Sequence, residues 1–231
     1  MNEMSRHTLG TIRLGAGVVT VATDNKPVVG RTNKLHISVK HRQQVTLSEL
    51  AFELFDEYWT TTGIEHRSLI SKNLGSISIQ EGVSTRISPE ITIPETTAIG
   101  CGPAACTAVL TFSIRGETVS RSFGLTPLSE PKLTAVIEPV VEQVYTVCDS
   151  FLVTDRSGCN HSITQSVRFA PTDDTPTTEP VDVFVRSVSD GLHVAPTVGH
   201  EPRTPVSELP DPVLVTEDDG DDRLVDAVEQ L

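Results

Sequence analysis

Hydrophobic and polar side chains alternate along most of this chain. Residues 34–40 are typical: Leu35, Ile37 and Val39 fall on one side of an extended backbone, and polar side chains fall on the other. Successive side chains of a β-strand point to opposite faces, so this pattern predicts strands with one face in a core and one in water. Gly, Pro, Asn and Asp separate the alternating runs and supply turns. The chain is therefore predicted to be an all-β protein of many short antiparallel strands.

The alternating pattern recurs in both halves of the chain. The predicted strands are residues 18–23, 34–40, 45–59, 76–80, 83–87, 106–115, 117–123, 145–154, 162–169, 181–188 and 191–198. The run 45–59 is long for a strand and is expected to bend. Residues 88–94 are predicted as an extended edge segment, since Pro89 and Pro94 cannot donate a ladder hydrogen bond.

The spacing of apolar residues changes to three and four in residues 131–144, where Leu133, Val136 and Val140 would share one face. This spacing predicts a helix with one buried stripe, kinked at Pro139. Because strand alternation resumes directly afterwards, the helix is predicted to join two domains. The predicted organisation is an N-terminal β-sandwich over residues 1–128, a connector helix over 129–145 and a smaller C-terminal β-sandwich over 146–198.

Residues 199–231 form a tail that is Pro-rich at first and acidic later, with five carboxylates in residues 217–222. Such a composition is typical of a solvated linker. Leu224 and Val228 then share one face of a predicted short terminal helix, which could pack on its own domain or in a partner's groove. The sequence leaves both alternatives open. It also leaves open whether the acidic stretch binds a basic partner or only solvates the protein.

The chain of 231 residues has a formal net charge of -13. Nucleic-acid binders carry clustered Lys and Arg, so this charge argues against a nucleic-acid partner. Arg outnumbers Lys by 13 to 5, and this skew together with the excess of acid is typical of haloarchaeal proteins adapted to high salt. Residues 1–13 contain no apolar block, and no run of about 20 apolar residues follows. These observations predict a cytoplasmic protein without stable membrane insertion.

The chain contains four cysteines, Cys101, Cys106, Cys148 and Cys159, and the candidate metal ligands are Cys101, Cys106, Cys159 and His161. Structural zinc sites usually contain two pairs of ligands, each pair closely spaced in sequence, and only Cys101 and Cys106 approach that spacing. The scatter of the cysteines also does not suit a disulfide-stapled fold. We therefore expect reduced thiols, with Cys106 and Cys148 as small core residues in strands, and no metal or other cofactor.

Sequence motifs of common enzymes are missing. The chain has no G-x-S-x-G elbow, P-loop, G-x-G-x-x-G or H-E-x-x-H string. Seven histidines are dispersed along it, and His36, His41 and His66 are expected to be solvated or hydrogen-bonded surface residues. The chain is therefore predicted not to be an enzyme, and a Cys/His metal-binding protein is the less favoured alternative.

The order of these strings resembles the sporulation-control protein family of the arrestin-like superfamily. The likeness rests on a collinear series: a Val- and Thr-rich strand at residues 18–23, an aromatic strand ending at Trp59, Pro89 followed by Ile93-Pro94, and a proline-flanked connector. It covers about residues 18–198, and the acidic tail has no counterpart in the pattern. The resemblance implies two arrestin-like β-sandwiches, no catalytic centre, and regulation or scaffolding through protein contacts.

The residues expected to bind a partner are apolar, and some lie at a free strand edge: Ile91, Ile93, Trp59, Leu224 and Val228. A free edge such as residues 91–93 can accept a strand of another chain through backbone hydrogen bonds. Trp59 is either an exposed anchor or, as the favoured alternative, a core residue. The partners implied are cytoplasmic regulatory, cytoskeletal or trafficking proteins, and a homo-oligomer is left open. The alternative function is a coat-like trafficking adaptor at a membrane surface.

Overall fold

The computed structural model describes residues 6–94, 97, 106–125, 145–155, 162–171, 179–188, 191–201 and 213–215. All long regular elements among them are β-strands, which confirms the all-β class for this part of the chain. None of these residues lies in a helix, so no helix there is long and apolar enough to cross a membrane. The predicted connector helix falls outside the described residues except for Tyr145, which begins a strand, and the predicted terminal helix lies outside them entirely.

The chain divides into two compact units that interleave along the sequence. Unit 1 contains Met1–Asp56, Ser68–Thr97 and Cys106–Leu128. Unit 2 contains Glu57–Arg67, Ala98–Ala105 and Ser129–Leu231. The segment Glu57–Arg67 thus groups with unit 2, although it lies within residues 1–128.

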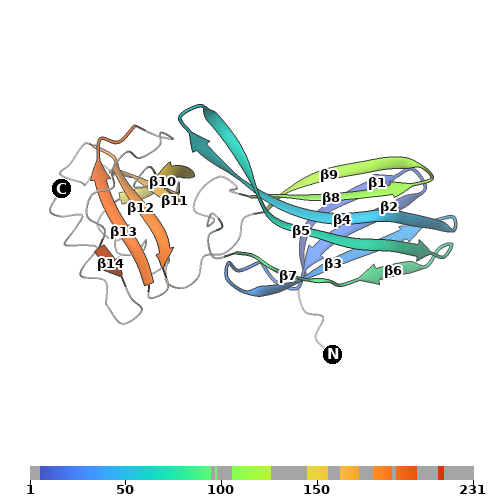
Figure 1. Ribbon diagram of the computed structural model, residues 1–231. Helices are drawn as coiled ribbons and strands as arrows, with labels where there is room; N and C mark the ends of the chain where they lie inside the picture. Colours follow the sequence, from blue (N-terminus) through green and yellow to red (C-terminus); the bar gives the residue numbers. More distant parts are fainter. Residues whose placement is uncertain are drawn as a thin grey trace. The chain divides into compact units, whose positions relative to one another are not determined.

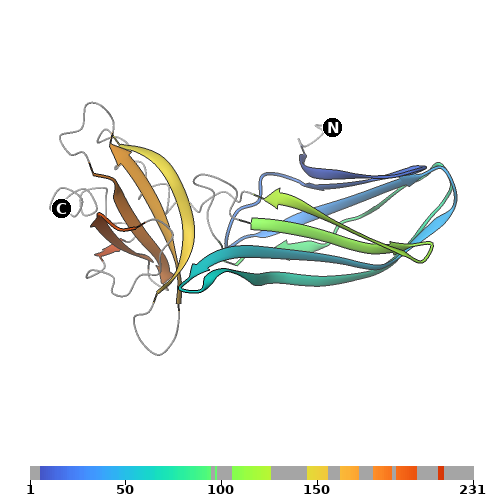
Figure 2. The same ribbon diagram turned by 90° about the horizontal axis from the view of Figure 1, so that it is seen from above.

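Unit 1 is built from two sheets that lie face to face (Figures 1 and 2). The first sheet has the order β1-β2-β3-β6, and β7 also pairs with β3. Its strands are β1 (His7–Leu14), β2 (Gly17–Thr23), β3 (Thr32–His41), β6 (Ser84–Ile87) and β7 (Glu90–Thr92). In the second sheet β4 lies between β5 and β8, and β9 follows β8. Its strands are β4 (Val45–Thr60), β5 (Gly63–Ile79), β8 (Cys106–Ile114) and β9 (Glu117–Leu125).

The core of unit 1 is formed by the inward side chains of both sheets. Leu35, Ile37 and Val39 of β3 are fully buried, as their alternation predicts. Phe52 of β4 and Phe112 of β8 are fully buried as well. Complete burial of one such side chain stabilises a fold by about 1.5–3 kcal/mol relative to exposure. The inward faces of these strands therefore supply the apolar interior that a sandwich needs.

Strand β4 contains a β-bulge. Its pairing with β8 shifts register between Ser48 and Ala51, and Glu49 has a φ of 53°. A bulge places an extra residue in one strand and bends that strand, which gives the cause of the bend expected in residues 45–59. The Glu49 carboxylate accepts a hydrogen bond from Ser113 Oγ at 2.7 Å, and this bond helps to hold the bulge.

The described part of unit 2 contains one sheet with the order β14-β13-β12-β11-β10. Its strands are β10 (Tyr145–Asp155), β11 (Ser162–Pro171), β12 (Val181–Val188), β13 (Gly191–Val198) and β14 (Val213–Val215). β14 lies in the tail, where no strand was expected. Tyr58 and Trp59 run parallel to Leu152 and Val153 of β10. A complete sandwich in this unit stays a prediction.

Strand β12 is buried on both faces, since residues 181–185 are all buried. Its register with β11 places Asp182 opposite Arg168 and Phe184 opposite Ser166, on one face of the sheet. The valines of the same run point to the other face. In a strand that is covered on both sides, odd- and even-numbered positions can both be apolar. The sequence of such a strand therefore does not show which of its faces packs against the core.

Candidate functional site

The proline-bounded segment expected to bind a partner contains β7, at an edge of the first sheet of unit 1. Among the described residues β7 pairs only with β3, where Ile91 lies opposite Asn33 and Thr92 opposite Thr32. The side chains of Ile91 and Ile93 are buried. A partner at this edge would therefore meet the backbone of the segment rather than these two side chains.

The hydrogen bonds of this segment show which backbone groups face outward. The N–H of Leu35 donates to the carbonyl oxygen of Pro89 at 2.9 Å. In an antiparallel ladder, bonds to one neighbour recur at every second residue, so the polar backbone groups of Ile91 also face β3. The N–H and C=O groups of Thr92 consequently face away from β3.

Lys72 of β5 covers part of the same edge. Its Nζ donates a hydrogen bond to the carbonyl oxygen of Glu90 at 2.5 Å, which joins the two sheets of unit 1. A lysine at a strand edge, like a proline beside it, disfavours indiscriminate pairing with other edges. The edge is therefore protected by charge and proline, while the Thr92 backbone groups stay turned outward.

Trp59, near the end of β4, is half-buried and packs within unit 2. It lies against a buried cluster formed by Val153, Phe184 and Ala195. This packing supports the core interpretation of Trp59 over that of an exposed anchor. Leu224 and Val228, which complete the set of expected partner-binding residues, lie outside the described residues.

Two of the four cysteines, Cys106 and Cys148, are described. Cys106 is buried, as predicted, but Cys148 is exposed and was wrongly expected in the core. It sits at a register shift of β10, between Val147 and Asp149, which displaces it from the regular alternation. The part of the chain that the structure describes contains no group of three or more His, Cys, Asp or Glu side chains able to hold a metal.

A chain of three polar side chains joins segments of unit 1 that are distant in sequence. His36 Nδ1 lies 2.8 Å from Ser88 Oγ, and His36 Nε2 lies 2.5 Å from Asp24 Oδ1. Only 8% of the His36 side chain is exposed, so its expected surface position is wrong although it is hydrogen-bonded. Both ring nitrogens have partners, which offsets the cost of removing the ring from water.

Asp, His and Ser are also the side chains of nucleophilic triads, in which His accepts the Ser proton and the carboxylate orients the imidazole. Such a site further needs donors aimed at a developing oxyanion and room for a substrate. Here the backbone beside Ser88 belongs to the β-ladder, because the Pro89 carbonyl accepts the Leu35 N–H. The observed contacts tie the turn after β2 and the β6–β7 connection to β3.

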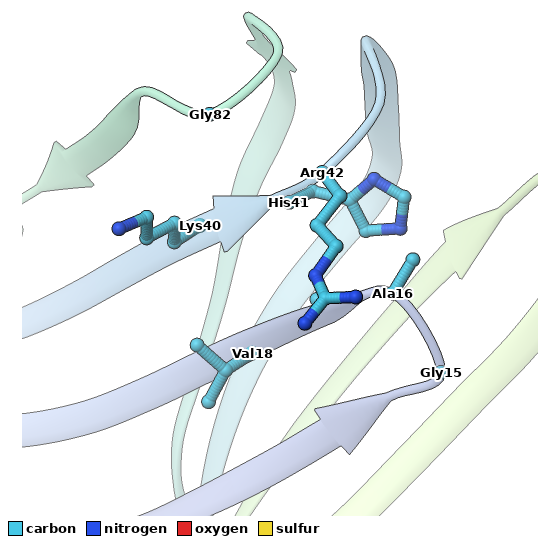
Figure 3. A pocket seen from close by; sticks show the side chains of 8 residues that line it. Gly15, Ala16, Val18, Lys40, His41, Arg42 and Gly82 are labelled. Atoms are coloured by element: carbon cyan, nitrogen blue, oxygen red, sulfur yellow. The ribbon is translucent and has the colours of Figure 1, made fainter.

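An open hollow of about 390 Å³ lies at one end of the first sheet (Figure 3). Its lining residues are Gly15, Ala16, Gly17, Val18, Lys40, His41, Arg42 and Gly82. In Figure 3 the Arg42 side chain extends toward Val18, whereas the Lys40 side chain extends away from Arg42. Two cationic residues, Lys40 and Arg42, and three glycines thus line the hollow.

The turns around this hollow are fixed by backbone hydrogen bonds. Arg42 N–H donates to the Ala16 carbonyl at 2.9 Å, and Gly82 N–H donates to the His41 carbonyl at 2.9 Å. His41 is buried rather than at the surface, because it occupies an inward position of β3; its Nδ1 lies 2.9 Å from the Gln43 carbonyl oxygen. The site is thus held in shape before any ligand arrives.

Unit 2 contains a buried ion pair between β11 and β12. Arg168 Nη2 lies 3.0 Å from Asp182 Oδ2, and the two side chains are 13% and 0% exposed. The same Nη2 donates to the His200 carbonyl at 2.7 Å, and Ser166 Oγ donates to Asp182 Oδ1 at 3.4 Å. Burial raises the pKa of the Asp182 carboxyl above its ordinary value, against the opposing effect of the Arg168 and His200 charges.

No protein-family model and no curated protein sequence matches this chain. Among solved structures, the chain is similar to the crystal structure of Spo0M, a sporulation control protein from Bacillus subtilis. The two are 17% identical, the TM-score is 0.68, and the match covers 94% of this chain and 95% of that chain. Identity this low supports a statement about fold and leaves activity open. The chain therefore has a fold similar to that of the sporulation control protein Spo0M.

Proposed function

We propose that this chain is a non-catalytic regulatory protein that acts in the cytoplasm by binding other proteins. The main support is the fold likeness to a sporulation control protein, which extends over 94% of the chain. A shared fold is a guide to function rather than a proof of it, so the binding site needs its own support. That support comes from the edge of β7.

The proposed binding mode is addition of a partner strand at the outer edge of β7. The Thr92 N–H and C=O groups face away from β3, and such a pair of groups can bond to one residue of an added strand. The buried side chains of Ile91 and Ile93 anchor the edge to the core. Lys72 leaves the edge less open to unspecific pairing, which suits a regulatory contact.

Site-specific crosslinking in cells tests this proposal. A photo-crosslinking amino acid at Thr92 is expected to capture a partner protein, because Thr92 is exposed at the edge. The same amino acid at the exposed Ser122 of β9 is the matched control and should not capture that partner. The captured protein should then bind the purified chain with a defined stoichiometry.

The substitution Thr92→Pro provides the second arm of this experiment. Proline removes the outward N–H and leaves the backbone bonds toward β3 in place; it also removes the exposed hydrogen bond of 3.0 Å between the Thr92 and Thr32 hydroxyls, which contributes little, so thermal unfolding should change little while partner binding is lost. The binding mode is refuted if Thr92→Pro binds the captured partner normally, or if crosslinks from Thr92 and Ser122 yield the same proteins.

The non-catalytic part of the proposal is tested at Ser88. A fluorophosphonate probe reacts with serines that a neighbouring base activates. We expect no labelling of the purified protein, because the Asp24, His36 and Ser88 contacts serve to join three segments. Labelling that disappears in Ser88→Ala and in His36→Gln would show instead that this serine is a reactive nucleophile.

A further inference from the structure

The outward face of the first sheet of unit 1 carries cations that strand addition at β7 does not use. The strand register aligns side chains in rows across this face. One row consists of Arg13, Val18, Lys40 and Ser84, and the next consists of Thr11, Thr20, Ser38 and Arg86. Both rows run across β1, β2, β3 and β6, so residues far apart in sequence become neighbours on one surface.

Burial shows that these rows face away from the core. Ile12 and Val19, which alternate with the row residues, are 3% and 0% exposed. Arg13, Lys40 and Arg86 are exposed, as the opposite parity along a strand requires. Arg42, directly after β3, is exposed beside the same face.

We call Arg13, Lys40, Arg42 and Arg86 the basic strip. The two rows contain no carboxylate, and none of these four side chains forms an ion pair within the described part of the chain. Arg86 Nε donates only to the hydroxyl of Ser38, at 3.1 Å. In a chain of net charge -13, four unpaired cations on one face repel one another, and an anionic ligand would relieve that repulsion.

Among the described residues of the first sheet and its turns, the carboxylates are Asp24, Glu81 and Glu90, and none of them lies in the two rows. Asp24 and Glu90 lie toward the opposite end of the same sheet, where Asp24 pairs with His36 and Glu90 lies opposite Lys34. Glu81 is in the turn that supplies Gly82 to the hollow. Lys40 and Arg42 belong to the strip and also line the hollow, where backbone hydrogen bonds of Arg42 and Gly82 hold the turns.

We propose that the basic strip binds an extended acidic segment of a partner protein. This inference rests on the proposed function, because its ligand is a protein. Neighbouring strands lie about 4.8 Å apart, which separates the Cα atoms of Arg13 and Lys40 by about 10 Å, and those of Lys40 and Arg86 by about 8 Å. Alternate residues of an extended peptide lie about 7 Å apart. Flexible Glu and Arg side chains bridge the small difference.

The overall charge of the chain favours a short peptide over a larger polyanion. A membrane surface or a nucleic-acid duplex would bring many negative charges close to a chain of net charge -13. A peptide touches the strip alone. Arg binds carboxylates through paired short-range hydrogen bonds, and contacts of about 3 Å are not longer than the Debye length even at about 1 M salt.

Fluorescence anisotropy with purified full-length protein tests the proposal. The probe is a labelled peptide of about eight residues with alternating Glu and Ser, which spans about 25 Å when extended. We expect it to bind at about 0.15 M salt, more weakly at about 1 M salt, and the same peptide with Gln in place of Glu not to bind. Equal binding of both peptides would overturn the proposal.

Two triple variants with the same change in net charge locate the site. Arg13→Gln/Lys40→Gln/Arg86→Gln should lower the affinity for the Glu peptide at least about tenfold. The control, Lys26→Gln/Arg31→Gln/Lys34→Gln, changes three exposed cations of the same unit outside the strip and should lower it less than about twofold. Equal losses in the two variants would mean general charge attraction and would refute the site.

Further arms separate this proposal from its competitors. Glu81→Gln removes the carboxylate of the residue next to Gly82, which lines the hollow, and should raise the affinity slightly. Vesicles containing phosphatidylserine should not bind; if they bind through the strip and the peptide does not, the face is a membrane contact and the proposal is wrong.

The two proposals can fail separately. Absence of peptide binding to the strip would leave partner capture at Thr92 unaffected, and absence of capture at Thr92 would leave the peptide titration unaffected.

Discussion

The two units of this protein each contain a buried cluster, and the two clusters are of different kinds. In unit 1 the largest fully buried side chains are aromatic and aliphatic, among them Phe52 and Phe112, although the unit also buries polar side chains such as Asp56. In the described part of unit 2, Phe184 shares its face of the sheet with Asp182, a fully buried carboxylate. One core is mainly hydrocarbon, and the other includes an ion pair.

This difference determines how each core should respond to mutation. Loss of hydrocarbon contact costs free energy in proportion to the groups removed and the cavity left behind. A buried ion pair contributes little net stability, because desolvation offsets the attraction, yet removal of one partner leaves an uncompensated charge. Unit 1 should therefore depend on many residues to a similar degree, and unit 2 should be especially sensitive at Arg168 and Asp182.

The largest effect is expected for Phe112→Ala in unit 1. Truncation of a fully buried phenylalanine should lower the free energy of unfolding by about 3–5 kcal/mol. Urea denaturation can follow both units, with circular dichroism for all strands and the fluorescence of Trp59, the single tryptophan, for unit 2. A loss below about 1 kcal/mol would contradict the hydrocarbon core assigned to unit 1.

A slightly smaller effect is expected for Arg168→Met in unit 2. This variant leaves the buried Asp182 carboxylate without its cation, so the free energy of unfolding should fall by about 3 kcal/mol. The double variant Arg168→Met/Asp182→Leu removes both charges and should be close to the wild type. If the double variant is as unstable as the single one, the ion pair itself stabilises unit 2 and the contrast between the units fails.

Gly10→Ala should produce a moderate effect at the edge of the sandwich. A Cβ atom at Gly10 would collide with the ring of Phe123 on β9, and crowding of this kind typically costs about 1–3 kcal/mol. In the background Phe123→Ala the same substitution should cost clearly less, since the colliding ring is gone. Additive losses in the double variant would place the strain elsewhere.

The smallest effect is a pH dependence that unit 2 owes to Asp182. Its pKa is raised in the folded state, so between that value and the ordinary value of 3.8 the folded state binds more protons at this carboxyl than the unfolded state does. The contribution of Asp182 to the free energy of unfolding should therefore increase as the pH falls through this window. The stability of the wild type relative to that of Asp182→Asn should rise accordingly, and a constant difference would contradict the raised pKa.

Alternation of side chains predicts most strands of this fold but fails where a strand is irregular or exposed on both sides. In β1 the register shifts between Thr8 and Gly10, which breaks the spacing of its apolar residues. In β5 most side chains from Gly63 to Gly75 are exposed or half-buried, and Ile64 is 48% exposed. Neither segment has a clear apolar face, so pattern alone cannot find them.

Candidate sites were harder to predict than strands, because they depend on register. Asp24 and Ser88 are 12 and 52 residues from His36, and only the pairing of β3 with its neighbours brings them together. The basic strip likewise combines residues of three strands and one turn. The proline-bounded edge was found from sequence, because the signal for it is local.

The interleaving of the two units has a consequence for how the protein is made. Glu57–Arg67 groups with unit 2, whereas the segments on both sides of it group with unit 1. The packing partners of Trp59 include Ala195, so a nascent chain on the ribosome cannot enclose this indole until most of the message has been translated. Division of the chain at any one position would therefore not yield two fragments that each contain one whole unit.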